Sequence, residues 1–224
     1  MWGCGEAGGC QSLERKHLSK LGLTSVILVG GKSRRLGTNK ALVEVGGRTI
    51  LERVVGRLQP LSEESVLVVN TEAEVAQYER LGTWRIAVDV YPDGGSLGGL
   101  YTGLSVAETS HCLVVACDMP FLSGDLLAYM ILGADQYDVV MPRNDGLLEP
   151  LHAIYGVSCL APIRALLRSG DRKIINIVNF LPEVKVRYVE REEIERLDPR
   201  FLSFFNVNTR DDLVLAGRLA AEVD

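Results

Sequence analysis

The chain has 224 residues, a formal net charge of −5, 47% hydrophobic residues and 24% charged residues. This length fits one large α/β domain, and its repeated apolar runs favour one continuous core. The net negative charge argues against nucleic acid or an anionic membrane as a partner. No apolar run reaches the ~18 residues that a membrane-spanning helix needs.

Residues 1–23 show no clear periodicity, and charged residues interrupt any apolar stretch of a signal peptide. We predict a disordered extension at 1–23 and a single folded domain at 24–224. The five cysteines are an odd number in a chain without a secretory signal, so we expect reduced thiols in the cytoplasm. A monomer or weak oligomer is expected.

The first motif is an apolar strand, residues 26–29, that runs into a glycine-rich loop. Gly30 and Gly31 lack the Cβ atoms that would keep a ligand off the backbone, so successive N–H groups can cradle phosphate oxygens. An ATPase P-loop would need a glycine where this chain has Val26. The loop also carries the cations that would match phosphate charge, Lys32, Arg34, Arg35 and Lys40.

Strands and helices are predicted to alternate after this loop. Residues 41–45 are predicted to form a short strand. A capping box of Thr49 and Glu52 begins a helix that stops at Pro60, and a second box, Thr71 with Glu74, begins a helix that ends at 81. Strands are predicted at 65–69 and 86–90.

This alternation favours parallel strands joined by right-handed crossovers, which places ligands at the carboxyl ends of the strands. The glycine loop, Asn70 and Asp89 all follow predicted strands. Next comes a stretch with four glycines between 94 and 99, interpreted as a loop through which backbone can approach a flat or charged ligand. A helix is predicted over 101–108.

Asp118 follows a fully apolar strand at 113–116 and precedes a turn held by Pro120. Mg²⁺ takes one or two protein carboxylates and shares its remaining sites with phosphate and water. A carboxylate at a strand end opposite a phosphate cradle therefore predicts a magnesium ligand. Taken alone, an aspartate after a strand is more typical of a turn.

In the second half, helices are predicted at 123–132, at 158–167 and from 171 onward, and strands at 138–141, 149–155 and 184–189. The last of these strands is predicted to be antiparallel at a sheet edge. Thr209 is predicted to cap the terminal helix. Polar candidates near a second substrate are Arg143, Asn144 and His152, of which His152 is interpreted as structural.

Three motifs together resemble those of the nucleotidyltransferases that include molybdenum cofactor guanylyltransferases. They are the glycine loop from Leu28 to Lys40, the Cys-Asp-Met-Pro sequence around Asp118, and Asn-Val-Asn-Thr at 206–209. The resemblance implies one doubly wound, mostly parallel sheet with helices on both faces, as in nucleotide-diphospho-sugar transferases. Ser96 stands where the family usually has proline, so that loop is expected to be less rigid.

The resemblance also implies the reaction: GMP passes from GTP to the phosphate of molybdenum-molybdopterin, with Mg²⁺ on Asp118, and pyrophosphate leaves. It makes Lys40, Arg34 and Asp118 catalytic, and Asn206 and Asn208 ligands of the acceptor. Molybdoenzyme maturation proteins are further partners it suggests. The implied GTP-binding residues are Leu28, Val29, Gly30, Lys40, Asn70, Asp89 and Asp118.

Two alternatives remain at this stage. One is a cytidylyl- or sugar-1-phosphate nucleotidyltransferase of the same fold, although room at Gly30 suits a purine. The other is a nucleotide-binding accessory protein without catalysis. Such a protein would be expected to lose the metal carboxylate or the loop lysine, and both Asp118 and Lys40 are present.

Overall fold

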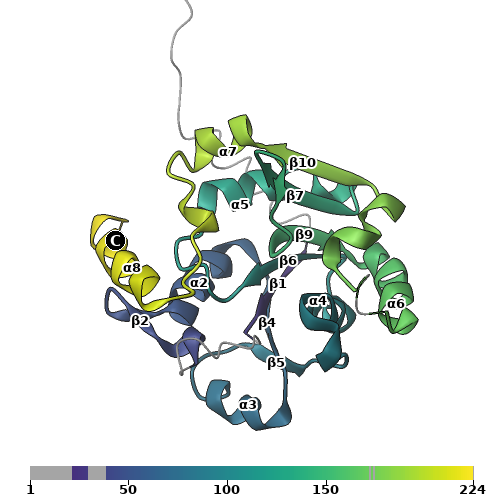
Figure 1. Cartoon of the computed structure of the whole chain (residues 1–224), viewed down its shortest axis with the longest axis horizontal. Helices are drawn as coiled ribbons and strands as arrows, with labels where there is room; N and C mark the ends of the chain where they lie inside the picture. Colours follow the sequence, from purple (N-terminus) through teal and green to yellow (C-terminus); the bar gives the residue numbers. More distant parts are fainter. Residues whose placement is uncertain (1–21, 30–38, 172, 174, 224) are drawn as a thin grey trace, which may run out of the picture.

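The computed structural model describes residues 22–29, 39–171, 173 and 175–223. The expected extension at 1–23 therefore lies almost entirely outside the described residues. Over the described part, one eight-stranded sheet forms the centre, with strand order β10-β7-β9-β6-β1-β4-β5 and β8 paired to β7 (Figure 1). Its strands are β1 Leu23–Leu28, β4 Glu64–Val69, β5 Arg85–Val88, β6 His111–Ala116, β7 Val139–Asn144, β8 Leu147–Leu148, β9 His152–Gly156 and β10 Val186–Glu190.

The sheet is mostly parallel, as the resemblance implied. β1 pairs in parallel with both β4 and β6, and β10 pairs in parallel with β7. β9 is antiparallel to its neighbours β6 and β7. The strands β1, β4, β5, β6, β7 and β10 consequently end at one common edge, where ligands of open α/β sheets bind.

Helices cover both faces, and each face has its own core. Leu97 and Leu104 of α4 and Ile163 of α6 pack on one face. Val54 of α2 and Leu126 of α5 belong to the core of the other face, to which α7 and α8 also contribute (Figure 1). The α-helices are α2 Ile50–Leu58, α3 Glu72–Tyr78, α4 Gly95–Val106, α5 Gly124–Ile131, α6 Leu160–Ser169, α7 Arg191–Leu197 and α8 Arg210–Val223.

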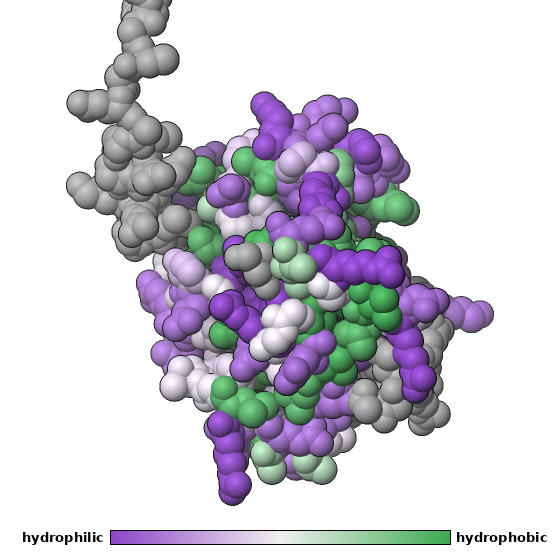
Figure 2. All heavy atoms as spheres, turned by 90° about the vertical axis from the view of Figure 1, so that its left-hand side faces the viewer, coloured by the Kyte–Doolittle hydropathy of each residue, from purple (hydrophilic) through white to green (hydrophobic). Residues whose placement is uncertain are grey.

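Short 3₁₀ helices join these elements, and a small antiparallel sheet of β2 Glu44–Val45 and β3 Arg48–Thr49 stands apart from the main one. The face that carries α8 mixes hydrophilic and apolar residues (Figure 2). No helix in the described ranges is long and apolar enough to cross a membrane. The 3₁₀ helices are η1 Lys40–Leu42, η2 Gln59–Leu61, η3 Pro92–Gly94, η4 Ala134–Gln136, η5 Val157–Cys159, η6 Ile177–Glu183 and η7 Leu202–Phe204.

Several predicted elements need correction. The strand predicted at 41–45 is η1 followed by the two residues of β2, because Gly46 and Gly47 adopt φ values of 58° and 77° and close a hairpin onto β3. The predicted glycine loop at 94–99 is mostly the first turns of α4, which begins at Gly95.

The second predicted capping box is wrong: Thr71 makes no side-chain cap, and Glu74 accepts from the N–H of Asn70 instead, with α3 ending at Tyr78. Of the helix predicted from 171 onward, the described residues 171, 173, 175 and 176 are not helical, and the next helical segment described is η6, which begins at Ile177. The edge strand β10 is parallel to β7, not antiparallel. β10 runs antiparallel to β9, the strand that precedes it in the chain, but it pairs with β7.

Candidate functional site

Asp118 lies where β6 ends, beside the end of β1. The N–H of Cys117 donates to the carbonyl of Leu28 at 3.1 Å, and the carbonyl of Asp118 accepts from Val207 at 2.9 Å. The carboxylate oxygen Oδ1 is buried and accepts no hydrogen bond from the described residues. Burial raises the pKa of this carboxyl, and the nearby Lys40 ammonium opposes that rise.

Lys40 begins the 3₁₀ helix η1 and reaches the same place. Its Nζ donates to Oδ1 of Asn208 at 2.7 Å and lies 3.8 Å from Oδ2 of Asp118. Asn39 fixes the start of η1, because its side chain accepts from Ala41 and donates to the hydroxyl of Tyr78. Only 16% of the lysine side chain is exposed, so its charge acts in a partly shielded setting.

Asn208 is held from its own side of the site. Its N–H and that of Thr209 both donate to Oδ2 of Asp212, at 2.9 and 2.8 Å. The hydroxyl of Thr209 accepts from the N–H of Asp212, which confirms the predicted cap of α8. Asn206 is placed differently, since its side-chain nitrogen donates to the carbonyl of Phe204. The asparagine side chain that hydrogen-bonds Lys40 is thus that of Asn208, while the Asn206 amide bonds to its own chain.

The residues predicted to bind the nucleoside lie at neighbouring strand ends. Asn70 follows β4, and Asp89 follows β5, with its N–H donating to Val69. Asp89 is buried, and its Oδ1 already accepts from the N–H of Tyr91 and from the hydroxyl of Thr102, at 2.8 and 2.9 Å. One carboxylate oxygen of Asp89 is therefore engaged by the protein itself.

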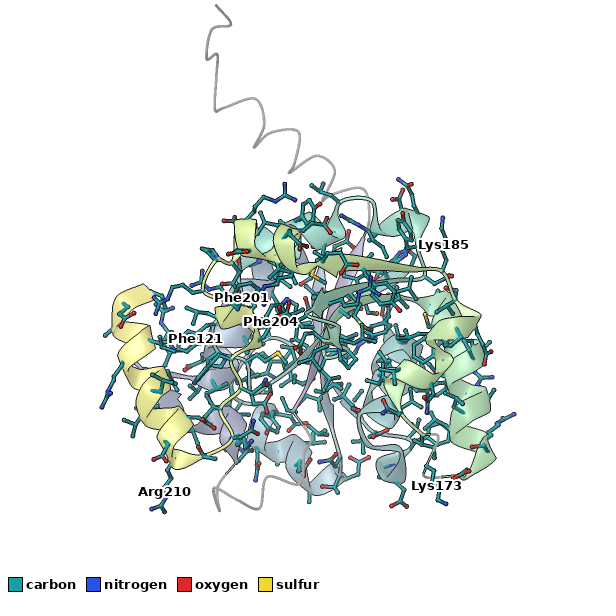
Figure 3. The ribbon with its side chains drawn as sticks, turned by 45° about the horizontal axis from the view of Figure 1, so that its top comes forward. Phe121, Lys173, Lys185, Phe201, Phe204 and Arg210 are labelled. Atoms are coloured by element: carbon teal, nitrogen blue, oxygen red, sulfur yellow. The ribbon has the colours of Figure 1, made fainter. Side chains whose placement is uncertain are left out.

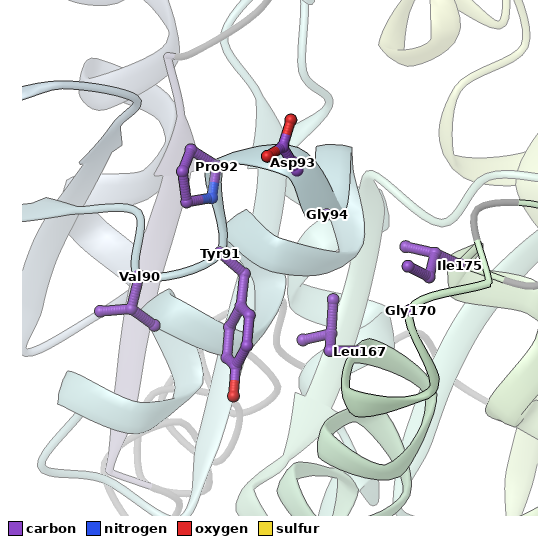
Figure 4. A pocket seen from close by; sticks show the side chains of 8 residues that line it. All are labelled: Val90, Tyr91, Pro92, Asp93, Gly94, Leu167, Gly170 and Ile175. Carbon is purple, nitrogen blue, oxygen red and sulfur yellow. The ribbon is translucent and has the colours of Figure 1, made fainter.

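The stretch after Asp89 forms the wall of a hollow of about 340 Å³ (Figure 4). Tyr91 stands edge-on to Tyr101, with ring centroids 5.2 Å apart. α4 begins at Gly95, and no side chain caps its N-terminus. The N–H groups of its first turn therefore face the carboxyl edge of the sheet without a hydrogen bond from a capping side chain. The hollow is lined by Val90, Tyr91, Pro92, Asp93, Gly94, Leu167, Gly170 and Ile175.

The remaining predicted nucleotide residues divide into two groups. Leu28 ends β1, and the following Val29 donates to the carbonyl of Val68 at 3.1 Å, so both lie at the same edge as Asp118. The predictions on Gly30 and Arg34 lie outside the described residues, together with Lys32 and Arg35.

The three polar residues predicted near a second substrate, in the second half of the chain, are paired or buried within the protein. Arg143 pairs with Glu190, and Asn144 accepts from Arg191. His152 is fully buried, and its ring lies against that of Phe204 with centroids 5.1 Å apart and planes tilted by 59°. Burial lowers the pKa of His152 to about 4. Phe204 lies between the central sheet and the chain leading to α8 (Figure 3). His152 is accordingly a core residue, as interpreted from the sequence.

Sequence reasoning missed Glu149 as a candidate. Its N–H donates to the carbonyl of Pro142, and its carbonyl accepts from the N–H of His152, which closes a turn over 149–152. Within this turn the carbonyl of Leu151 accepts from Ala116 of β6. Burial raises the pKa of its carboxyl, and no described residue donates a hydrogen bond to it. The only sequence signal was an acidic residue before Pro150, which is equally typical of a turn.

Comparisons with known proteins agree on one family. Residues 25–185 match the model of the MobA-like NTP transferase domain. The chain is 42% identical over 199 residues to a probable molybdenum cofactor guanylyltransferase of Pelotomaculum thermopropionicum, covering 89% of this chain and 93% of that protein. A molybdenum cofactor guanylyltransferase of Desulfosudis oleivorans is 34% identical, with 88% and 98% covered.

Solved structures show the same relationship. Molybdopterin-guanine dinucleotide biosynthesis protein A from Archaeoglobus fulgidus superposes with a TM-score of 0.77 at 28% identity, covering 89% of this chain and all of that one. A 2-C-methyl-D-erythritol 4-phosphate cytidylyltransferase from Thermus thermophilus reaches 0.65 at 19% identity, with 88% and 98% covered. The second likeness extends to the fold alone.

Proposed function

Because this chain belongs to the MobA-like NTP transferase family, we propose that it transfers GMP from GTP to the phosphate of molybdenum-molybdopterin, releasing pyrophosphate. Its relatives with 42% and 34% identity carry the name of that activity. The observation that carries the proposal is the meeting of Lys40, Asp118 and Asn208 at the carboxyl edge of the sheet. The family motifs that supply these residues are separated in sequence and joined by the fold.

This reaction asks the protein mainly for alignment and charge neutralisation. The acceptor phosphate forms a bond to the α-phosphorus of GTP as the bond to pyrophosphate breaks, and both partners are anionic. An ammonium held in a partly buried place can offset charge that builds on the transferring phosphate, without reorganising at the moment of reaction. Lys40 has that setting, since its side chain is mostly shielded and is hydrogen-bonded to Asn208.

Asp118 is the residue proposed to hold Mg²⁺. Its buried Oδ1 lacks a hydrogen-bond donor among the described residues, and its pKa is raised by burial, so a cation would relieve an unfavourable carboxylate. An oxygen donor of this kind suits Mg²⁺, which completes its shell with water and phosphate oxygens. When bound, the ion would supply neutralisation of phosphate charge.

Guanine is proposed to lie against the start of α4. A guanine ring presents donors at N1 and N2 and an acceptor at O6. The uncapped N–H groups of the first turn of α4 suit the acceptor, and Oδ2 of Asp89, to which no described residue donates, suits the donors. Because Oδ1 is engaged by Tyr91 and Thr102, only one oxygen of Asp89 remains for the base.

Steady-state kinetics with GTP, CTP and ATP test this function. We expect kcat/KM for GTP to exceed that for either competitor by on the order of 10²-fold, because a buried polar group left unpaired penalises the wrong base. Formation of the guanine dinucleotide and pyrophosphate would be followed with molybdenum-molybdopterin as acceptor. A preference for CTP would favour the cytidylyltransferase alternative instead.

A further inference from the structure

Lys40 and Asn208 are 168 positions apart in the sequence, yet Nζ of the lysine donates to Oδ1 of the asparagine at 2.7 Å. The resemblance had assigned Lys40 to the nucleotide and Asn208 to the acceptor. The hydrogen bond instead joins two residues expected to serve different substrates.

Asn208 is anchored independently of the lysine. Its N–H donates to Asp212 at 2.9 Å, and the N–H of Val207, which is buried, donates to the carbonyl of Asp118 at 2.9 Å. These two bonds tie the backbone at Asn208 to α8 and to the end of β6. An amide oxygen fixed in this way can hold a flexible partner.

Lysine is such a partner, because four rotatable carbons carry its ammonium and three donors rotate with it. One donor is taken by Asn208. The nearby Asp118 oxygen, at 3.8 Å, is too far for a hydrogen bond but close enough to favour the ammonium electrostatically. At least one N–H of Lys40 therefore remains for a phosphate oxygen while the asparagine bond persists.

We infer that Asn208 is a positioning residue for Lys40, which it holds in place for the phosphates of the nucleotide, rather than a ligand of the acceptor alone. This inference rests on the proposed function, because it assumes that Lys40 meets a nucleotide phosphate. Holding the ammonium before GTP arrives reduces the conformational freedom lost on binding. Removing Asn208 should therefore weaken GTP binding even when no acceptor is present.

A double-mutant cycle tests this coupling. GTP affinity would be measured by calorimetry with Mg²⁺ and without acceptor for wild type, Asn208→Ala, Lys40→Ala and the double variant. We expect Asn208→Ala to raise the Kd for GTP by up to about tenfold, because the lysine side chain must then be ordered when GTP binds. In the Lys40→Ala background, Asn208→Ala should cause no further loss, because the residue that it positions is gone.

Control variants separate positioning from a loss of folding. Asn208→Ser retains an oxygen too short to reach the ammonium and should show the same loss as Asn208→Ala. Asn176→Ala removes an exposed asparagine whose side chain caps η6, and it should leave the Kd for GTP unchanged. Each variant's melting temperature would be recorded to verify that it is folded at the assay temperature.

Two results would overturn the inference. Independent, multiplying effects of the two substitutions on the Kd would show that Asn208 does not act through Lys40. An unchanged or tighter Kd for GTP in Asn208→Ala, with a raised KM for the acceptor, would return Asn208 to the acceptor site. Failure of the wild-type protein to bind GTP would contradict the proposed function and not this coupling in particular.

Discussion

At the scale of single residues, the two aspartates of the site differ in how many partners the fold gives them. Asp118 keeps a buried carboxylate oxygen without a donor among the described residues, while Asp89 has one oxygen fully engaged by its own loop and by Thr102. The sequence could single out Asp118, which follows β6, and Lys40, which belongs to the glycine-loop motif, because each lies in a recognisable motif. It could not predict which asparagine would meet the lysine, since the 206–209 motif offers two and only the path of the chain after Phe204 separates them.

Replacing Asp118 tests the metal assignment. We predict that Asp118→Asn folds normally but loses at least ~10³-fold in turnover, because the neutral amide holds Mg²⁺ poorly at the reacting phosphates. Turnover would be measured over a range of Mg²⁺ concentrations, with circular dichroism to confirm the fold. Wild-type rates at ordinary Mg²⁺ would remove Asp118 from the mechanism.

His152 makes a prediction about stability and pH. Its pKa is lowered from 6.5 to about 4 by burial. As the pH falls below 6.5, the imidazole becomes protonated in the unfolded chain while it stays neutral in the folded chain. The free energy of unfolding therefore decreases until about pH 4, where the folded chain also binds the proton. The full effect is roughly 3 kcal/mol, since each pKa unit corresponds to about 1.4 kcal/mol.

His152→Phe should keep the ring contact with Phe204 but remove this proton. We expect the difference in unfolding free energy between variant and wild type, measured by urea titration, to grow in favour of the variant between pH 6.5 and about pH 4. Taking the difference cancels the contributions of acidic groups common to both proteins. Parallel pH curves would mean that the histidine has the same pKa in the folded and unfolded chains, so that burial does not shift it.

At the scale of elements, close packing around α4 sets the position of its first turn, against which guanine is proposed to lie. A Cβ atom at Gly98 would lie 2.3 Å from the carbonyl oxygen of Tyr91, and one at Gly103 would lie 2.3 Å from a methyl of Val26 in β1. Gly98 was predicted to form part of a ligand loop, and Gly103 was given no role. Their use in close packing follows from tertiary contacts that local sequence does not reveal.

Gly103→Ala should therefore destabilise the protein, by about 1–3 kcal/mol, because the added methyl has no room against β1. Gly56→Ala in α2 is the matched control, since nothing lies within 4 Å of the place where its Cβ would stand and alanine favours a helix by roughly 0.5–1 kcal/mol. Urea unfolding of both variants distinguishes them. Equal stability changes would show that α4 can shift away from β1 without cost.

Local signals predicted some elements and failed at others for a clear reason. The capping box of Thr49 and Glu52 is present in full, because both hydrogen bonds lie within four residues. The same pattern at Thr71 failed when Glu74 bonded one residue earlier, to Asn70. α7 was not predicted, although Glu192 and Glu193 near its start and Arg196 near its end match the helix dipole.

At the scale of the whole molecule, alternation of strands and helices predicted the parallel half of the sheet, and the motifs predicted the edge at which it is proposed to bind ligands. The sequence did not predict the antiparallel insertion of β9 between β6 and β7, nor the place of β10 beside β7. Those pairings depend on contacts distant in sequence. They matter for the site because the turn before β9 places Leu151 beside the end of β6, where its carbonyl accepts from Ala116.

GTP should raise the melting temperature, because it binds the folded chain and not the unfolded one. Its site is assembled from strand ends that separate on unfolding. At a GTP concentration of about 100 times Kd the stabilisation is roughly 2.7 kcal/mol. For a chain of this size each kcal/mol corresponds to about 2–4 °C, so we expect a shift of about 5–10 °C with Mg²⁺. CTP and ATP at the same concentration should shift the melting temperature much less.

Asp118→Asn should lose the part of the GTP shift that depends on Mg²⁺, which is measured by repeating the melt in excess chelator. An equal shift with all three nucleotides would mean that the protein holds the triphosphate without reading the base, and the wall formed by α4 and Asp89 would then have no part in selecting guanine.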